Sequence, residues 1–237
     1  MSQFFAALQD RVKRRGSDPL ITWYGPQNAR MELSGITFAN AVAKTAGMLI
    51  EELETQPGDT VLIRLPLHWQ LPMWCAAADV AGLNLVIQEL PSGQEPNFIV
   101  ETDETGDPRY PNAASIVTSV SAFGLPMAGL PESAIDHARL AMGQPDVFLG
   151  EPLAGQLANH GGVWWASQEV RDAALAAADS VGLTTGGRLL CALSSTGPEV
   201  ALLSWAAPLL LDATVVLVQS GDVTVIGHAE GSTATVL

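Results

Sequence analysis

Apolar positions along this chain repeat in two ways, one typical of amphipathic helices and one typical of buried strands. The apolar residues between Phe4 and Val12 recur at helical spacing before a glycine, which predicts a short first helix. Apolar runs at 20–24 and 30–33 flank a turn and predict two strands. Between residues 38 and 53 the apolar period is close to 3.6, so we expect a long helix with one face in the core.

One arrangement of elements occurs twice: a glycine turn, an apolar strand, a polar turn, an apolar helix and a β-branched strand. The first copy runs from Pro57 to Ile87 and the second from Thr185 to Val218. A crossover of this length joins parallel strands with a right-handed connection. The helix at 68–81 is apolar on nearly all sides, and Pro208 is expected to break the second helix. The pattern predicts an α/β fold with two related βαβ-containing subdomains and mainly parallel sheets.

The remaining segments suggest how the chain is organised. Residues 1–120 are expected to form a first α/β subdomain, with further strands at 98–100 and 116–117. Residues 121–162 are rich in Gly and Pro with little periodicity, which indicates an irregular connector. A second α/β subdomain, packed with the first into one unit, is expected at 163–237. Its first helix would be capped by Ser167, and its tail after residue 220 would add one or two strands.

Charge and composition narrow the function classes. The 237 residues are 48% hydrophobic, enough for a substantial core, and carry a formal net charge of -14 with 11 Lys and Arg. So few cations make nucleic acid an unsuitable partner. The one basic cluster, Arg11 to Arg15, is interpreted as the solvated end of the first helix. No export signal and no apolar run of about 20 residues is found, so we expect a cytoplasmic protein without a membrane partner.

The residues that most often carry chemistry form no recognisable constellation. Cys75 and Cys191 lie in apolar stretches and are expected to be small buried side chains. The four histidines show neither an i,i+4 pair nor zinc-motif spacing, so no metal site is predicted. No nucleophile elbow, dinucleotide-binding glycine fingerprint or Walker loop occurs. No catalytic residue is therefore assigned.

The two repeated segments carry a family resemblance. The first includes Pro57-Gly58-Asp59-Thr60-Val61-Leu62-Ile63 and the second ends in Pro208-Leu209 followed by a Val-rich strand. Their order resembles that of adenylate-forming enzymes, which include acyl-CoA synthetases, luciferases and nonribosomal adenylation domains. The similarity is greatest to short, AMP-binding-like proteins of actinobacterial type. The resemblance implies a truncated N-terminal domain, without the small C-terminal domain that completes the family's reaction. Where that family generally has Gly, this chain has Asp212, which tolerates a left-handed backbone at modest cost.

The family's phosphate loop is rich in Ser, Thr and Gly and contains a Lys. Backbone N–H groups approach the phosphates there, and the Lys offsets their charge. The resemblance places this loop just before Val163, where the chain has no hydroxyl run and no Lys. Three interpretations stay open for Ser194, Ser195, Thr196 and Gly197: a collapsed phosphate loop, a substrate-pocket turn, or an ordinary strand-to-helix turn.

Three hypotheses follow from a retained scaffold without its nucleotide loop. The first is a non-catalytic binding or partner protein, without a cofactor and without autonomous ligase activity. The second is an acyl or amino-acid ligase subunit completed by another chain, which would use ATP, Mg²⁺ and CoA. The third is a sensor that holds a nucleotide or acyl group between the two subdomains. Strand edges and apolar faces left uncovered by truncation favour a homo-oligomer.

Overall fold

The computed structural model describes residues 2–90, 93–102, 107–159, 161–193 and 197–237. The chain opens with helix α1 (Gln3–Arg15), whose N-cap Ser2 accepts a hydrogen bond from the Phe5 N–H. A hairpin of β1 (Pro19–Tyr24) and β2 (Arg30–Ser34) follows, with the 3₁₀ turn η1 (Pro26–Asn28) between its strands. Helix α2 (Gly35–Gly47) continues into the π-helical turn η2 (Met48–Glu52). The helices and strands expected in this region are confirmed.

The first βαβ copy also forms as expected. Strand β3 (Thr60–Ile63) leads to α3 (Gln70–Ala81), and β4 (Asn84–Ile87) returns parallel to β3 in direct register. Gly82 ends α3 with φ of +75°, a conformation that glycine adopts without a steric penalty. Every residue of α3 is buried, which agrees with an apolar pattern on all sides.

Further strands extend this unit into a seven-stranded sheet, within the described residues, in the order β7-β6-β5-β3-β4-β8-β9. Only β8 and β9 pair antiparallel. The short helix α4 follows β7. The added elements are β5 (Phe98–Glu101), β6 (Ala114–Val117), β7 (Ile135–Asp136), α4 (His137–Ala141), β8 (Leu157–Ala158) and β9 (Trp164–Trp165).

The second βαβ copy builds a five-stranded sheet in the order β12-β10-β11-β1-β2, again within the described residues. Strands β10 and β11 are parallel neighbours, as predicted. The elements are α5 (Ser167–Ser180), β10 (Arg188–Cys191), α6 (Pro198–Ala201), the π-helical turn η3 (Leu202–Ala206), α7 (Ala207–Leu210), β11 (Thr214–Val218), α8 (Val223–Ala229) and β12 (Ala234–Val236).

Two local expectations were wrong in detail. Pro208 does not break the second helix, because the π turn η3 before it opens the backbone where the proline ring would otherwise clash with a carbonyl. Ser167 is the first residue of α5, and the Glu169 carboxylate instead accepts the Ala166 N–H at 2.8 Å. The tail was expected to add one or two strands and adds one, β12, which follows helix α8 with Asp222 as its N-cap.

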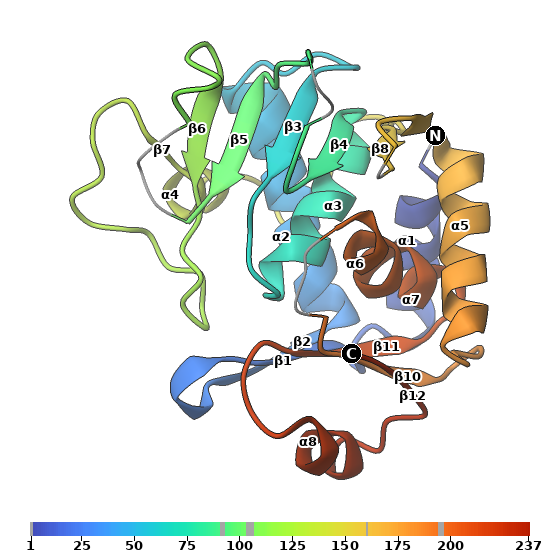
Figure 1. Cartoon of the computed structure of the whole chain (residues 1–237). Coiled ribbons are helices and arrows are strands. Elements are labelled where there is room, and N and C mark those ends of the chain that lie inside the picture. The colour runs from blue at the N-terminus through green and yellow to red at the C-terminus, as the bar shows by residue number, and fades with distance from the viewer. Residues whose placement is uncertain (1, 91–92, 103–106, 160, 194–196) are drawn as a thin grey trace.

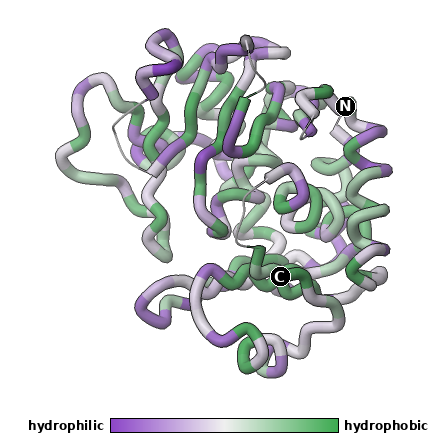
Figure 2. Tube along the Cα trace, viewed as in Figure 1, coloured by the Kyte–Doolittle hydropathy of each residue, from purple (hydrophilic) through white to green (hydrophobic). Residues whose placement is uncertain are grey.

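Helices α3, α6 and α7 lie between the two sheets, whereas α8 lies on the far side of the smaller sheet, so the molecule is built in layers (Figure 1). The largest apolar cluster fills this middle layer and joins α1, α2, α3, α5 and η3 to the inner faces of both sheets. Alternate strand residues point outward. Leu190, Val216 and Ile226 form a small cluster beneath α8, whereas Leu62 and Val86 belong to another on the outer face of the larger sheet. Apolar residues accordingly concentrate along the strands and the enclosed helices (Figure 2).

The boundaries expected at residues 120 and 163 do not coincide with the division into sheets. Strands β1 and β2 come from the first segment but join the smaller sheet, where Ile21 pairs with Val215. Strand β9 comes from the last segment but joins the larger sheet. The described residues of 121–162 contribute only short elements, among them β7, α4 and β8. Each sheet thus contains strands from both sides of the expected boundaries. Among the described residues, no helix is both long and apolar enough to cross a membrane.

Candidate functional site

The segment just before Val163 is a tight turn between β8 and β9. The Asn159 side-chain oxygen accepts hydrogen bonds from the N–H groups of Gly161 and Val163, at 2.9 and 3.0 Å. The Asn159 N–H donates to the Val163 carbonyl at 3.0 Å, and the Gly162 N–H donates to the Asn159 carbonyl. A phosphate loop needs backbone N–H groups that are free to point at an anion. Four of the groups in this turn are engaged within the turn itself.

The other candidate segment follows β10. Ser194, Ser195 and Thr196 lie outside the described residues, so their interpretation stays a prediction. Gly197 has an extended backbone and stands at the N-cap of α6, with Pro198 at the first helical position. Proline is well suited to that position because its missing N–H would lack a helical partner anyway. The described part of this segment is a strand-to-helix connection.

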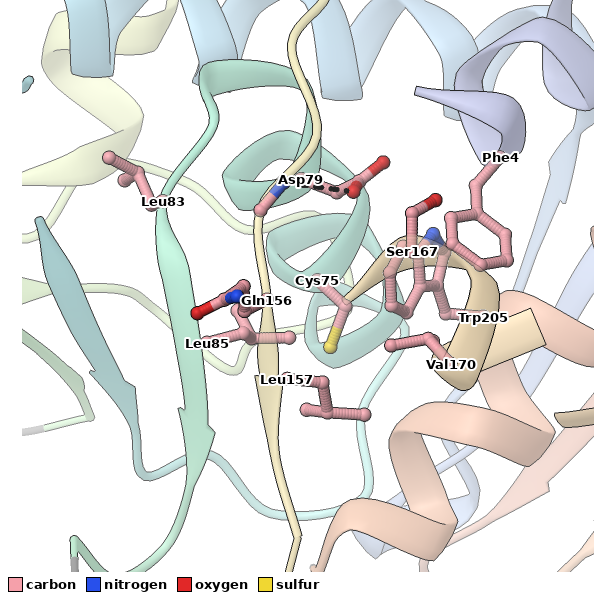
Figure 3. Close-up of a pocket in the computed structure, with 11 residues that line it drawn as sticks. Phe4, Cys75, Asp79, Leu83, Leu85, Gln156, Leu157, Ser167, Val170 and Trp205 are labelled. Atoms are coloured by element: carbon pink, nitrogen blue, oxygen red, sulfur yellow. Dashed lines mark hydrogen bonds between the residues drawn. The ribbon is translucent and has the colours of Figure 1, made fainter. Parts of the chain in front are cut away.

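A small cavity lies where α1, α3, α5 and η3 meet strand β8 (Figure 3). Its volume is about 10 Å³, close to the least that holds one water molecule. The side chains around it include Phe4, Cys75, Asp79, Ser167 and Trp205. Such a space cannot take a nucleotide or an acyl chain. The sensor hypothesis therefore gains no support from this cavity.

Asp79 is the one acidic side chain at this cavity, and it is 5% exposed. Its carboxylate accepts hydrogen bonds from the Ser2 hydroxyl and from the Gly155 N–H, the latter at 3.3 Å. It thereby links α3 to the start of α1 and to the segment entering β8. Burial raises the pKa of the Asp79 carboxyl to about 7, and the two hydrogen bonds oppose that rise. Sequence reasoning missed this group, although a single carboxylate in an otherwise apolar helix was a usable signal.

The two thiols are free and buried, as predicted. Burial raises the pKa of the Cys75 thiol far above its ordinary value and that of the Cys191 thiol to about 11. Both sulfurs are protonated near neutral pH, whereas a nucleophilic cysteine needs the thiolate. The Cys75 sulfur lies beside the cavity (Figure 3) and acts there as an apolar lining group.

Two histidines are buried. The ring nitrogens of His137 lie 3.0 Å from the hydroxyls of Thr45 and Thr118, and the ring packs against Trp74. His68 packs edge-on against Trp23. Burial lowers the pKa of both imidazoles to about 4, so both are neutral at physiological pH. Across the described ranges, no group of three or more His, Cys, Asp or Glu could hold a metal ion.

The basic cluster in α1 is not simply a solvated helix end. Arg11 is 1% exposed and its guanidinium lies 2.6 Å from the Asp212 carboxylate. It also donates to the Pro19 carbonyl at 2.9 Å. Asp212 has φ of +48°, which agrees with the left-handed conformation expected for it. Arg14 and Arg15 approach the same carboxylate from more exposed positions. This ion pair fastens α1 to the smaller sheet.

Solved structures with the same fold include coenzyme A synthetases. The *Brucella canis* acyl-CoA synthetase matches 99% of this chain with a TM-score of 0.76 at 17% identity. MatB from *Rhodopseudomonas palustris* and the *Bacillus subtilis* O-succinylbenzoate coenzyme A synthetase match 98% and 97% of it, each with a TM-score of 0.65, at 15% and 16% identity. The chain spans just under half of each: 47%, 48% and 46%. Its fold is that of the N-terminal part of these enzymes.

No protein-family model matches the chain. A *Mycobacterium tuberculosis* protein described as a TIGR03089 family protein is 30% identical over 221 residues. The aligned region covers 92% of this chain and 89% of that relative. An alignment of this extent and identity shows that the chain belongs to the TIGR03089 family.

Proposed function

We propose that this protein is a non-catalytic relative of adenylate-forming ligases that acts as a binding or partner protein. The observation that carries the proposal is the turn at 159–163. Its N–H groups donate hydrogen bonds to Asn159 and Val163, and the segment contains no Lys that could offset the charge of a phosphate. The described part of this turn offers no free N–H groups to the β- and γ-phosphates of ATP, which must be bound when an acid is activated as its adenylate.

Exchange of pyrophosphate into ATP tests this proposal. The purified chain is incubated with ATP, Mg²⁺, labelled pyrophosphate and a panel of fatty, aromatic and amino acids. An active acyl-CoA synthetase on its own substrate is the positive control. We expect no acid-dependent label in ATP. Label that depends on one acid and disappears with boiled protein would refute the proposal.

The second candidate is a ligase subunit that another chain completes. It is favoured by the extent of the match, since almost the whole chain aligns with only about half of each solved synthetase. The test is co-expression with a chain that supplies the remaining part of an adenylate-forming enzyme, encoded near the same gene. A stable complex that exchanges pyrophosphate, while neither chain does so alone, would favour this candidate over the first.

Self-association is a related proposal. Strands β2 and β12 end the smaller sheet, and β7 and β9 end the larger one. An edge strand presents backbone N–H and C=O groups that another copy can pair with. Light scattering coupled to gel filtration gives the mass directly. We expect at least a dimer, and a mass near the 24.9 kDa of one chain would contradict this proposal.

A further inference from the structure

A continuous groove runs between the end of α2 with η2 and the irregular segment that follows α4. We call it the acidic groove, and it is formed by residues 43–57 and 144–153 together with Ala81. It consists of two adjoining hollows of about 320 and 590 Å³, which share Ile50, Phe148 and Gly150. These volumes fall within the range of binding pockets in proteins. The groove is far larger than the buried cavity beside Asp79.

The floor and one border of the acidic groove are apolar. Phe148 packs its ring edge-on against Phe5 of α1, which holds the floor in place. Beside it, Val147 is 67% exposed and Leu149 is 81% exposed. Large apolar side chains that face water next to a hollow are typical of a protein interaction surface. Both side chains are therefore accessible to a partner.

The other groups around the groove are negative. Glu51, Glu54 and Glu151 line it, and none of the three has an ion-pair partner among the described residues. The one cation on these two segments, Lys44, already pairs with Asp146 at 2.9 Å. A ligand that covers the apolar floor would therefore meet uncompensated carboxylates at its edges. Basic side chains spaced along an apolar face satisfy both conditions.

A second copy of this chain is poorly suited to fill the groove. Its lysines and arginines, apart from Arg171, already lie within 4 Å of one of its own carboxylates. Arg171 contacts the side chain of Gln3. The net charge of -14 attracts a cationic partner from a distance. The occupant must come from a different protein.

We propose that the acidic groove binds a segment of a partner protein that is amphipathic and basic, with apolar side chains on Phe148 and Leu149 and Lys or Arg against Glu51, Glu54 and Glu151. The groove lies on residues other than the turn at 159–163, so this proposal stands whether or not the chain adenylates an acid. It goes beyond the proposed function by giving the chemistry and the location of the partner contact.

The test uses a synthetic peptide of about 14 residues in which Leu recurs at helical spacing among Lys. Binding is followed by NMR on the ¹⁵N-labelled protein and quantified by fluorescence anisotropy. We expect amide shifts concentrated at 43–57 and 144–153. A peptide of the same composition in scrambled order separates specific docking from simple attraction to a negative protein, and we expect it to bind about tenfold more weakly.

Two groove variants and one matched control complete the experiment. The triple variant Glu51→Lys, Glu54→Lys, Glu151→Lys and the single variant Leu149→Asp should each weaken binding about tenfold or more. Leu149 is so exposed that its replacement should leave the fold intact, which circular dichroism checks. Glu95→Lys alters an exposed carboxylate outside the groove and should change the affinity less than about twofold. Shifts mapped elsewhere, equal binding of the scrambled peptide, or unchanged affinity in both groove variants would overturn the proposal.

Discussion

Replacing Asp79 with Asn should change how the stability of this protein depends on pH. Asparagine keeps the shape of the side chain and still offers an oxygen to the Gly155 N–H, but it cannot ionise. Burial raises the pKa of the carboxyl from its ordinary value of 3.8 to about 7. A difference of about 3 units between folded and unfolded chains corresponds to about 4 kcal/mol of stability, as an upper bound.

The direction in which stability changes with pH follows from how many protons the folded and unfolded chains bind. Between pH 4 and pH 7 the folded chain keeps the Asp79 proton whereas the unfolded chain has released it. The contribution of Asp79 is thus fully present below about pH 4 and is lost as the pH rises through about 7. The Asn variant has no ionisable group at position 79, so it does not lose this stability as the pH rises. Its free energy of unfolding minus that of the wild type should therefore increase by up to about 4 kcal/mol from pH 4 to pH 8.

Urea denaturation followed by tryptophan fluorescence, repeated across this pH range, measures the difference. His68 and His137 titrate in the same range, but they are present in both proteins and cancel. Glu95→Gln serves as the control for replacing an exposed carboxylate with its amide. A difference for the Asn variant that stays constant within about 1 kcal/mol would refute the reasoning on burial.

Three further predictions concern stability and are checked by the same denaturation assay. Arg11→Ala should cost about 1–3 kcal/mol, because it removes the hydrogen bonds of a buried guanidinium to Asp212 and to the Pro19 carbonyl, while Arg14 and Arg15 still lie near the Asp212 carboxylate; a cost under about 0.5 kcal/mol would contradict this role. Gly155→Ala should cost about 1–3 kcal/mol or more, since the added Cβ would lie 1.9 Å from a backbone oxygen, while Gly143→Ala meets only an ordinary contact and should be nearly neutral. Burial lowers the pKa of His137 to about 4, so the folded chain keeps this imidazole neutral. The contribution of His137 to the free energy of unfolding is therefore fully present above about pH 6.5 and is lost as the pH falls toward 4. His137→Gln should therefore lose less stability than the wild type over that interval, and an equal loss would contradict this assignment.

Much of the fold was predictable because local patterns determine it. Compact apolar runs predicted strands β3, β4, β10 and β11. The apolar helix between the strands of each pair predicted that they run parallel, joined by a crossover connection. The all-round apolar character of α3 reflects its place between two sheets. Long-range pairings carry no such local signal. Nothing in the pattern near Ile21 indicates that it pairs with Val215, so the exchange of strands between the expected subdomains could not be foreseen.

The sequence predicted where the candidate site lies, but it did not predict the hydrogen bonds that its residues make. Family order placed the expected phosphate loop before Val163, and the missing Lys was evident in the sequence. The hydrogen bonds that Asn159 makes across the turn depend on three-dimensional geometry and appear only in the structure. The same holds for Arg11, whose partner lies 201 residues away. Asp79 differs, because a lone carboxylate in a buried helix already implies a polar partner.

Direct binding of ATP tests the central claim that the turn at 159–163 does not bind nucleotide phosphates. The protein is titrated with ATP and Mg²⁺ in a calorimeter, with an active acyl-CoA synthetase as the control, and amide shifts of Gly161 and Val163 are followed by NMR. We predict no saturable heat up to about 1 mM ATP and no shift of these two amides. Saturable binding of one ATP per chain, accompanied by shifts at the 159–163 turn, would contradict the claim.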